Sequence, residues 1–381
     1  MKVDVLLAVG YDPDVRVRRE TQALAAAGHD VRILAWDRDG SRPPREADGP
    51  VRVERVAVIS RWGRGVGQAR FLAKLAFTYL RRVRARRPDV LHAVDLPMLL
   101  IALAIRPFAG RPRVVYDAFE LYAVMVSRRM PGPALAVIRW LEQRLPRAAD
   151  LVIAPGEIRV RYLAERGIRA VAIPNWIDPP ARPPDRHIAR TALGIPMDRF
   201  VLVYAGALHP ARDLDMLLDH AERVSSDMVL IAGMGEDAQR LQQRAAALEN
   251  VRMLGWLRDP TTLLAAADAV YYALRPEHPY ARLACPNNLY AAIAHGVPLV
   301  YRAQGELALV GDRHLIGSAF VHAEGLADAI DRVRDPAEND RIRASLRGLR
   351  ERYSWARAAE LLLATYPTKG SAASSATTNG P

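Results

Sequence analysis

The chain of 381 residues is long enough for two domains, each with its own hydrophobic core. Apolar residues make up 50% and charged residues 25%, which is typical of a soluble globular protein. The single cysteine, Cys285, excludes an intrachain disulfide, and no apolar run reaches the roughly 18 residues of a membrane span. We therefore expect a protein of the reducing cytoplasm. The opening MKVDVLLAVG carries Asp4 in its apolar run, so we expect a first strand and not a signal peptide.

The net charge of +12 is concentrated in the first half of the chain. Residues 1–180 carry 31 basic and 19 acidic side chains, whereas residues 181–381 carry 23 of each. Residues 61–90 alone contain nine basic side chains and one acid, Asp89. A general preference for arginine would not select one half of the chain. The pattern therefore favours an anionic partner, such as a membrane surface or a phosphorylated acceptor, and we expect no nucleic acid.

Strand and helix patterns alternate from the N-terminus, which is typical of parallel α/β folds. The expected strands of the first half are 3–9, 29–36, 51–59, 89–95, 113–118, 151–155 and 170–175. The expected helices are 15–28, 67–87, 96–108, 131–147 and 156–167. Helix 67–87 is apolar on one face and basic on the other. This indicates either an ordinary helix packed on the sheet or a helix that lies on a membrane surface.

Residues 178–190 form the predicted linker, because the stretch DPPARPPDRHI is rich in proline and polar residues. The alternation then restarts, with expected strands at 200–206, 228–235, 251–257, 269–274 and 298–302 and expected helices at 211–224, 236–248, 260–267 and 287–295. We predict two doubly wound, Rossmann-like α/β domains, 1–177 and 191–345, with a ligand cleft between them. A closing helix at 346–366 and a disordered tail at 367–381 complete the prediction.

Several segments, in order along the chain, resemble the GT-B glycosyltransferases of the family 4 type, which use nucleotide sugars and retain the anomeric configuration. The matching segments are DVRVRRETQALAAAGHDVRILAW, DVLHAVDLPML, RVVYDAFELY, ADLVIAPGE, AVAIPNWID, YAGALHPARDLDMLLDHA, IAGMGED, CPNNLYAAIAHGVPLV and YSWARAAELL. The resemblance covers residues 1–366. It implies an acceptor-binding N-terminal domain and a C-terminal domain for the nucleotide sugar, which is a donor substrate and not a cofactor. No catalytic metal is implied, because arginine and helix dipoles can neutralise the diphosphate.

Glycines and one arginine mark the donor side of the expected site. Gly206 ends a strand and lets the backbone approach a ligand, and Gly233 and Gly235 permit a tight turn from strand into helix. The resemblance places Arg212 where the family carries a basic residue that binds the diphosphate. The family often has a second arginine directly after the first glycine, and Ala207 stands there instead.

The stretch PNNL opens the helix expected at 287–295. Asparagine is a good N-cap, its amide can face a phosphate, and the free N–H groups of a helix N-terminus attract anions. We therefore expect Pro286, Asn287, Asn288 and Leu289 at the donor.

The same helix lacks the acid that the family uses to hold the ribose. The resemblance places that glutamate at Ala291 and its partner acid at Leu283. Their absence removes ribose hydrogen bonds worth about 1–2 kcal/mol each but leaves the backbone contacts to phosphate. Glu277 or His278, in the loop RPEHPY, could fill the space, and we predict a catalytic role for Glu277.

His92 and Asp95 are the other predicted catalytic residues. His92 comes at the end of an expected strand, where the family has a histidine that contacts the transferred sugar. The second histidine of that pattern is replaced by Val94. Asp95 could orient His92 or bind acceptor hydroxyls, whereas a structural role for His92 is the alternative.

Four further residues are expected at the acceptor. Asp117 and Glu120 flank Phe119, which stands where the family has a histidine. Asp14 and Arg16 belong to the first strand–helix loop, where the resemblance brings acceptor and diphosphate together.

The sequence thus predicts a retaining, metal-independent hexosyltransferase that acts on a lipid-linked saccharide or a small molecule, in polysaccharide or natural-product glycoside synthesis. We expect it in the cytoplasm and at the inner face of the membrane as a peripheral protein. The replacements at Leu283, Ala291 and Phe119 leave two alternatives open. One is a catalytically silent paralogue that serves as a binding or helper subunit, and the other is an enzyme resembling the GT-B nucleotide-sugar epimerases.

Overall fold

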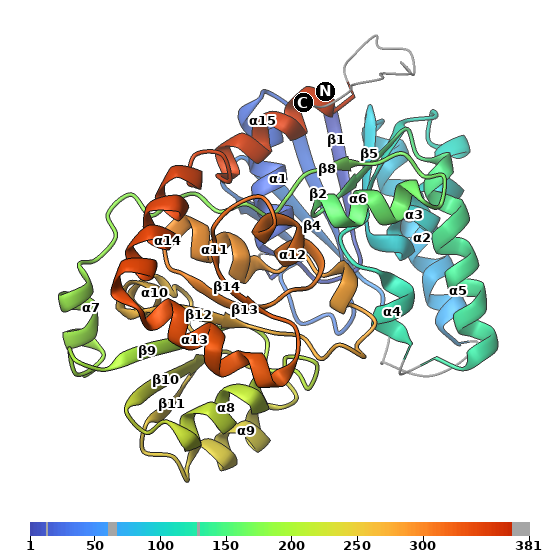
Figure 1. The fold of residues 1–381 in the computed structure, drawn as a ribbon. Helices are drawn as coiled ribbons and strands as arrows, with labels where there is room; N and C mark the ends of the chain where they lie inside the picture. Colours follow the sequence, from blue (N-terminus) through green and yellow to red (C-terminus); the bar gives the residue numbers. More distant parts are fainter. Residues whose placement is uncertain (13, 60–66, 128–129, 368–381) are drawn as a thin grey trace. The chain divides into compact units, whose positions relative to one another are not determined.

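The computed structural model describes residues 1–12, 14–59, 67–127 and 130–367 (Figure 1). The chain divides into two compact units, of which unit 1 comprises Met1–Pro174 and the chain from Ala359 onward, and unit 2 comprises Asn175–Ala358. Each unit is a sheet covered by helices, as the alternating pattern predicts. The predicted tail lies outside the described residues except for Pro367.

The described strands of unit 1 form one sheet in the order β3-β4-β2-β1-β5-β6-β7-β8. Their bounds are β1 (Lys2–Leu7), β2 (Asp30–Asp37), β3 (Arg45–Asp48), β4 (Val51–Ala57), β5 (Val90–Val94), β6 (Arg113–Asp117), β7 (Leu151–Ala154) and β8 (Val171–Ala172). Neighbouring strands pair in parallel, except for β3 and β4, which are antiparallel. The strand order reverses between β1 and β5, which is the doubly wound arrangement.

Helices cover both faces of this sheet (Figure 1). One face carries α2 (Gly67–Arg86), α3 (Asp95–Ile105), α5 (Gly132–Arg144) and α6 (Glu157–Ala164), and the other carries α1 (Val15–Ala26) and the end of α15 (Trp355–Thr365). Leu75 and Tyr79 of α2 are buried in the same cluster as Leu34 of β2. The apolar side of α2 therefore packs on the sheet, and the short helix α4 (Tyr122–Val126) follows β6.

The described strands of unit 2 form a parallel sheet in the order β11-β10-β9-β12-β13-β14. The strands are β9 (Phe200–Ala205), β10 (Asp227–Ala232), β11 (Val251–Gly255), β12 (Ala269–Tyr272), β13 (Leu299–Arg302) and β14 (Gly317–Phe320). The helices are α7 (Arg186–Ala192), α8 (Leu214–Arg223), α9 (Ala238–Ala245), α10 (Thr261–Ala266), α11 (Asn287–His295), α12 (Gly305–Gly311), α13 (Leu326–Arg334) and α14 (Pro336–Leu349). One hydrophobic core joins these elements, and the order reverses between β9 and β12.

The structure adds elements that the sequence patterns did not predict. These are β3, α4, α7, α12, β14 and α13. Helix α7 occupies the end of the predicted linker, where Asp185 caps its N-terminus by accepting hydrogen bonds from the N–H groups of His187 and Ile188. The predicted closing helix is two helices, α14 and α15, separated by residues 350–354.

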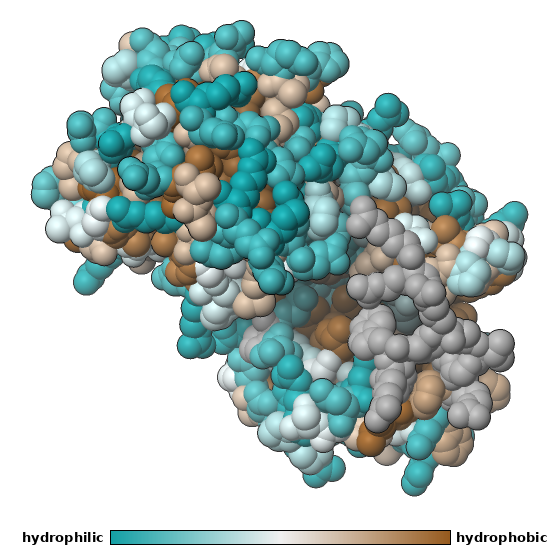
Figure 2. Space-filling view, turned by 90° about the horizontal axis from the view of Figure 1, so that it is seen from below, coloured by the Kyte–Doolittle hydropathy of each residue, from teal (hydrophilic) through white to brown (hydrophobic). Residues whose placement is uncertain are grey.

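The surface is hydrophilic over most of the face drawn in Figure 2, where apolar side chains form small separate groups. None of the described helices combines the length and the apolar character that a membrane span requires.

Candidate active site

The carboxyl edge of the unit 2 sheet is the first candidate site. Its strand order reverses between β9 and β12, so the loops that follow these two strands lead away in opposite directions. Ligands of doubly wound sheets bind at the carboxyl ends of strands at such a reversal. The segments that follow β9, β10 and β12, together with the start of α11, make up this edge.

Two glycines allow the loops after β9 and β10 to pack directly on each other. Gly233 and Gly235 have φ angles of 151° and 157°. A Cβ atom at Gly233 would fall on the carbonyl oxygen of Gly206, and one at Gly235 on the carbonyl oxygen of Leu208. The N–H of Leu208 donates to the carbonyl of Met234 at 2.8 Å, which joins the loops. The glycines predicted for the donor therefore lie together. Glycine is required at Gly233 and Gly235 because the facing backbone leaves no room for a side chain.

Arg212 lies at the point where the strand order reverses. Its guanidinium donates a hydrogen bond to the hydroxyl of Tyr272, the last residue of β12, and lies 5.1 Å from the centre of that ring. Burial raises the pKa of Tyr272, although the charge of Arg212 acts in the opposite direction. The tyrosine therefore stays a neutral hydroxyl that holds the half-buried guanidinium in place.

Helix α11 begins where the sequence predicts it, with Pro286 as its N-cap residue. The side-chain amide of Asn288 donates to the carbonyl of Ala205, the last residue of β9, at 2.9 Å and so ties the helix to the sheet. Asn287 is exposed, whereas Pro286 and Leu289 are buried. Of the four predicted donor residues here, Asn287 is thus the most exposed, Asn288 is half-buried, and Leu289 belongs to the core.

Acidic and imidazole groups gather at the same edge. Glu277 is exposed in the loop between β12 and α11, and the ring of the neighbouring His278 lies 6.0 Å from that of His209. The Nε2 atom of His209 lies 3.1 Å from a carboxylate oxygen of Glu236. Sequence reasoning missed His209 and Glu236. The available signal was their position, within three residues of the glycines in GALHPARD and GMGED.

The positions where the family carries its paired acids are Leu283 and Ala291. Leu283 ends a short 3-10 turn before α11, and Ala291 packs against the core from within the helix. Both are half-buried. The carboxylates exposed at this edge are instead those of Glu236 and Glu277, among the residues that the structure describes.

Asp95 is the central residue at the carboxyl edge of unit 1, where the order reverses between β1 and β5. It has a φ of 63°, which is uncommon for a residue with a side chain. Its carboxylate accepts a hydrogen bond from the N–H of Glu120 at 2.9 Å. Burial raises the pKa of Asp95 to about 8, although the hydrogen bond from Glu120 acts to lower it. The negative charges of Asp117, Glu120 and Asp14 raise the pKa further.

Asp14 and Glu120 also lie at this edge, where Asp14 caps a helix and Glu120 contacts Asp95 and a small pocket. Asp14 caps α1 by accepting hydrogen bonds from the N–H groups of Arg16 and Val17 at 3.0 and 3.1 Å. Glu120 follows β6 and is half-buried. Its backbone holds Asp95, and its side chain lines a small pocket.

That pocket has a volume of about 120 Å³ and is mainly apolar. Leu121 and Val124 line it beside the buried Tyr116. Glu142 of α5 lies at its wall and accepts a hydrogen bond from the N–H of Ala123 at 3.2 Å. Burial raises the pKa of Glu142.

Arg16 and Asp117 bind each other inside unit 1. The guanidinium of Arg16 makes two hydrogen bonds of 2.8 Å with the carboxylate of Asp117. It also lies 2.9 Å from a carboxylate oxygen of Glu20 and donates to the carbonyl of Ile173 at 2.7 Å. The side chains of Arg16, Glu20 and Asp117 are at most 2% exposed. These two predicted acceptor residues therefore form a buried ion-pair network.

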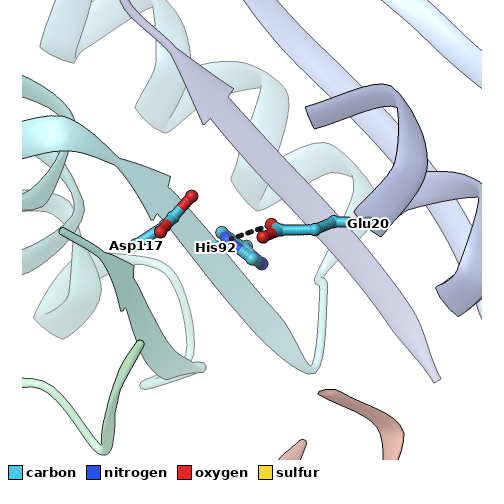
Figure 3. A group of neighbouring side chains, drawn as sticks. All are labelled: Glu20, His92 and Asp117. Carbon is cyan, nitrogen blue, oxygen red and sulfur yellow. Dashed lines mark ion pairs between the residues drawn. The ribbon is translucent and has the colours of Figure 1, made fainter. Parts of the chain in front are cut away.

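His92 belongs to the same network and lies between Glu20 and Asp117 (Figure 3). Its Nδ1 atom lies 3.2 Å from the hydroxyl of Tyr366, and its Nε2 atom lies 3.5 Å from Glu20. Burial lowers the pKa of His92 to about 4, and Arg16 adds to this effect while Asp117 opposes it. The imidazole is therefore neutral at pH 7.

Glu20, His92 and Asp117 offer ligand atoms within 4.8 Å of one another, so the geometry alone would suit a metal ion. Arg16, however, makes two hydrogen bonds to the carboxylate of Asp117 and lies 2.9 Å from the carboxyl group of Glu20. A fixed positive charge at this distance opposes a second cation, and both oxygens of Asp117 already accept hydrogen bonds from Arg16. The group is therefore best described as an arginine-centred ion-pair network.

The comparisons with known proteins agree with this architecture. Residues 13–176 match the family model of the glycosyl transferase 4-like domain, and residues 199–335 match that of glycosyl transferases group 1. Over 374 residues, 89% of this chain and 86% of the relative, the sequence is 28% identical to glycogen synthase of Mycobacterium tuberculosis. Over 315 residues, 77% of this chain and 78% of the relative, it is 27% identical to a GDP-mannose-dependent alpha-mannosyltransferase of Mycolicibacterium smegmatis.

Solved structures show the same fold. Sucrose-phosphate synthase from Thermosynechococcus elongatus matches with a TM-score of 0.76 at 18% identity, over 96% of this chain and 98% of that one. Anabaena HepE in complex with UDP-glucose matches with a TM-score of 0.70 at 19% identity, over 96% and 99%. The fold is thus that of the GT-B glycosyltransferases. The chain belongs to glycosyltransferase family 4 and is a retaining, nucleotide-sugar-dependent hexosyltransferase, which confirms the resemblance seen in the sequence.

Proposed function

We propose that the chain transfers a hexose from a nucleoside diphosphate to an acceptor hydroxyl in the synthesis of a polysaccharide or a natural-product glycoside. The carboxyl edge of unit 2 is the observation that carries this proposal. Arg212 lies at the strand reversal, and the N-terminus of α11 is tied to β9. Both are positive groups suited to a diphosphate, which gains a further negative charge on its leaving oxygen during transfer.

The donor sugar and ribose require other contacts, because Leu283 and Ala291 offer no carboxylate. We assign Glu277 as the carboxylate that contacts the donor sugar. It is exposed in the loop between β12 and α11. Glu236 and His209 lie near it through the ring contact of His209 with His278. Without the paired acids, the ribose contributes less to binding, by about 1–2 kcal/mol for each lost hydrogen bond.

We assign Asp95 as the group that binds the acceptor hydroxyl and takes up its proton. A carboxyl group whose pKa is raised to about 8 can exchange a proton near neutral pH, and Asp95 lies at the strand reversal of unit 1. His92 is buried and neutral, so we assign it a positioning role within the ion-pair network. The apolar pocket beside Glu120 would take an apolar part of the acceptor, which favours an amphipathic acceptor over a free sugar.

The exposed side of α2 supports peripheral membrane binding near the acceptor unit. Lys74, Phe77, Arg81 and Arg84 are exposed and recur at helical spacing, and 62% of the Phe77 surface is accessible. Cationic side chains around an exposed aromatic suit an anionic lipid surface. Binding to vesicles that contain phosphatidylglycerol should exceed binding to neutral vesicles and fall in Lys74→Glu/Arg81→Glu. Equal binding to both vesicle types would refute this assignment.

Product analysis tests the proposed reaction and separates it from the two alternatives. Purified protein is incubated with radiolabelled nucleotide sugars and an envelope lipid extract or a panel of phenolic acceptors. Label on an acceptor, lost in Arg212→Ala, supports the transferase. A free, altered sugar and free nucleotide without acceptor labelling would support the epimerase-like alternative. Nucleotide binding without turnover would support the helper subunit, which the replacements at Leu283, Ala291 and Phe119 motivate.

A further inference from the structure

A large basic pocket lies at the opposite edge of the unit 1 sheet from Asp95. It has a volume of about 620 Å³, within the usual range of small-molecule sites. Its lining comes from the first residues of β1, β2, β3 and β4 and from the C-terminal turns of α2. Strand β1 has six residues, so this amino edge lies roughly 20 Å from the carboxyl edge.

The strand pairing explains why charged side chains gather there. Asp4 of β1 pairs with Arg32 of β2, and Arg32 pairs with Arg52 of β4. Arg45 of β3 pairs with Glu54, two residues further along β4. Partners at equal register point to the same face of a sheet, so a charged row crosses four strands.

The same face is apolar further along the strands. Leu6, Leu34 and Val56 are buried there with Leu75 and Tyr79 of α2. The core under α2 thus ends before the amino edge, where Arg82 and Arg86 of α2 lie over the charged row. The pocket is therefore a separate polar hollow, open to solvent, at the end of the hydrophobic core.

Cationic side chains outnumber carboxylates in this pocket. The cationic lining residues are Lys2, Arg32, Arg45, Arg52, Arg82 and Arg86. The carboxylates are Asp30 and Glu54 in the lining and the buried Asp4 beneath it, which leaves an excess of three positive charges.

The buried cations are already paired, whereas the outer ones are not fully used. Arg32 and Arg86 share Asp4, and their side chains are 7% and 10% exposed. Arg52 pairs with Asp30 with 57% of its side chain exposed. Within the described part of the chain, Arg45 takes part in no ion pair and no side-chain hydrogen bond, and it is exposed. A paired, buried inner row thus lies beneath the exposed Arg45 and Arg52, whose side chains are open to a ligand.

We propose that this pocket is a second ligand site, which binds a multiply charged phosphate group carried either by a free phosphorylated molecule or by a phospholipid headgroup. Arginine binds phosphate through parallel N–H donors. Several arginines around one pocket therefore suit an anion that carries two or more negative charges. The excess of three charges is what such an anion would neutralise. The site belongs to unit 1 and shares no residue with the proposed donor site in unit 2, so its test does not depend on the proposed reaction.

The experiment compares the full-length protein with two double variants. Arg45→Glu/Arg52→Glu reverses the two outer cations of the pocket. Arg169→Glu/Arg223→Glu makes the same change of net charge at exposed positions that take part in no described ion pair. The unfolding midpoint of each protein is measured first, and the neutral Arg45→Gln/Arg52→Gln replaces the charge reversal if that variant fails to fold.

The first arm is calorimetric titration with inorganic pyrophosphate at low salt. Pyrophosphate can also occupy the diphosphate site of unit 2, so the readout is the number of sites. We expect the wild type and the control to bind pyrophosphate at one site that is absent, or at least tenfold weaker in affinity, in Arg45→Glu/Arg52→Glu. Binding at this site should weaken at high salt.

The second arm measures binding to phosphatidylcholine vesicles with and without phosphatidic acid. Loss of acid-dependent vesicle binding in Arg45→Glu/Arg52→Glu, with pyrophosphate binding unchanged, assigns the headgroup as the ligand. Loss of a pyrophosphate site assigns a free phosphorylated molecule. If the two double variants behave alike in both arms, the proposal is overturned.

Discussion

Replacing Arg16 tests whether the buried network of unit 1 is an ion-pair network that stabilises the fold. Arg16→Ala would leave the buried carboxylate of Asp117 without the guanidinium that contacts it at 2.8 Å, and the carboxyl group of Glu20 would lose its contact at 2.9 Å. Removing one partner from a buried, hydrogen-bonded charge group costs about 3–5 kcal/mol. For a unit of this size, that corresponds to a fall of roughly 6–20 °C in the unfolding midpoint.

Arg18 provides a matched control two residues away on the same helix. It pairs with Asp48 at 3.0 Å, but half of its side chain is exposed. An exposed pair contributes about 0–1 kcal/mol, so Arg18→Ala should change the midpoint little. Both variants are measured by thermal unfolding at pH 7 followed by circular dichroism. Equal midpoints for Arg16→Ala and Arg18→Ala would refute the reasoning.

Three further predictions follow from the same contacts. Gly233→Ala would place a methyl group on the carbonyl of Gly206 and should abolish nucleotide binding in calorimetry, whereas Gly132→Ala, which meets open space, should bind normally. Burial raises the pKa of Glu20 from its ordinary 4.5 to about 8, although the charge of Arg16 acts in the opposite direction, so the folded state holds an extra proton between these values. Stability in urea should therefore fall as pH rises from about 5 to 8, and Glu20→Gln should flatten this slope; an unchanged slope would count against the buried acid. Asp95→Asn should keep the unfolding midpoint, because asparagine tolerates a positive φ, and should lower the transfer rate about 10²–10⁴-fold in a product assay. Wild-type rates in Asp95→Asn would exclude the carboxyl as the acceptor group.

The sequence predicts the sheets well, because most strands are buried runs of apolar residues. Helix α11 lies where the PNNL entry and the following glycine place it, from Asn287 to His295. The C-cap Gly296 has a φ of 68°, which other residues rarely adopt. Strand β3 was missed because three of its four residues, Arg45–Asp48, are charged and the strand pairs only with β4 at the sheet edge.

The site was harder to predict, because burial depends on contacts between distant segments. Arg16 looks like any other basic residue in VRVRRE, yet its side chain meets Asp117 at a separation of 101 residues. The contact of His92 with Tyr366 depends on the residue directly after α15, which follows all of unit 2 in the chain. The amino-edge pocket likewise depends on strand register, which brings Asp4, Arg32 and Arg52 into one row.

The most direct test of the account is calorimetric binding of UDP, GDP, ADP, CDP and dTDP to the purified chain and to Arg212→Ala. The carboxyl edge of unit 2 predicts that one of these nucleotides binds to the wild type and binds at least about tenfold weaker when the guanidinium is removed. Such a result would also identify the donor base. If a well-folded sample binds none of the five, the donor site has not survived the loss of its acids at Leu283 and Ala291, and the account of this edge is wrong.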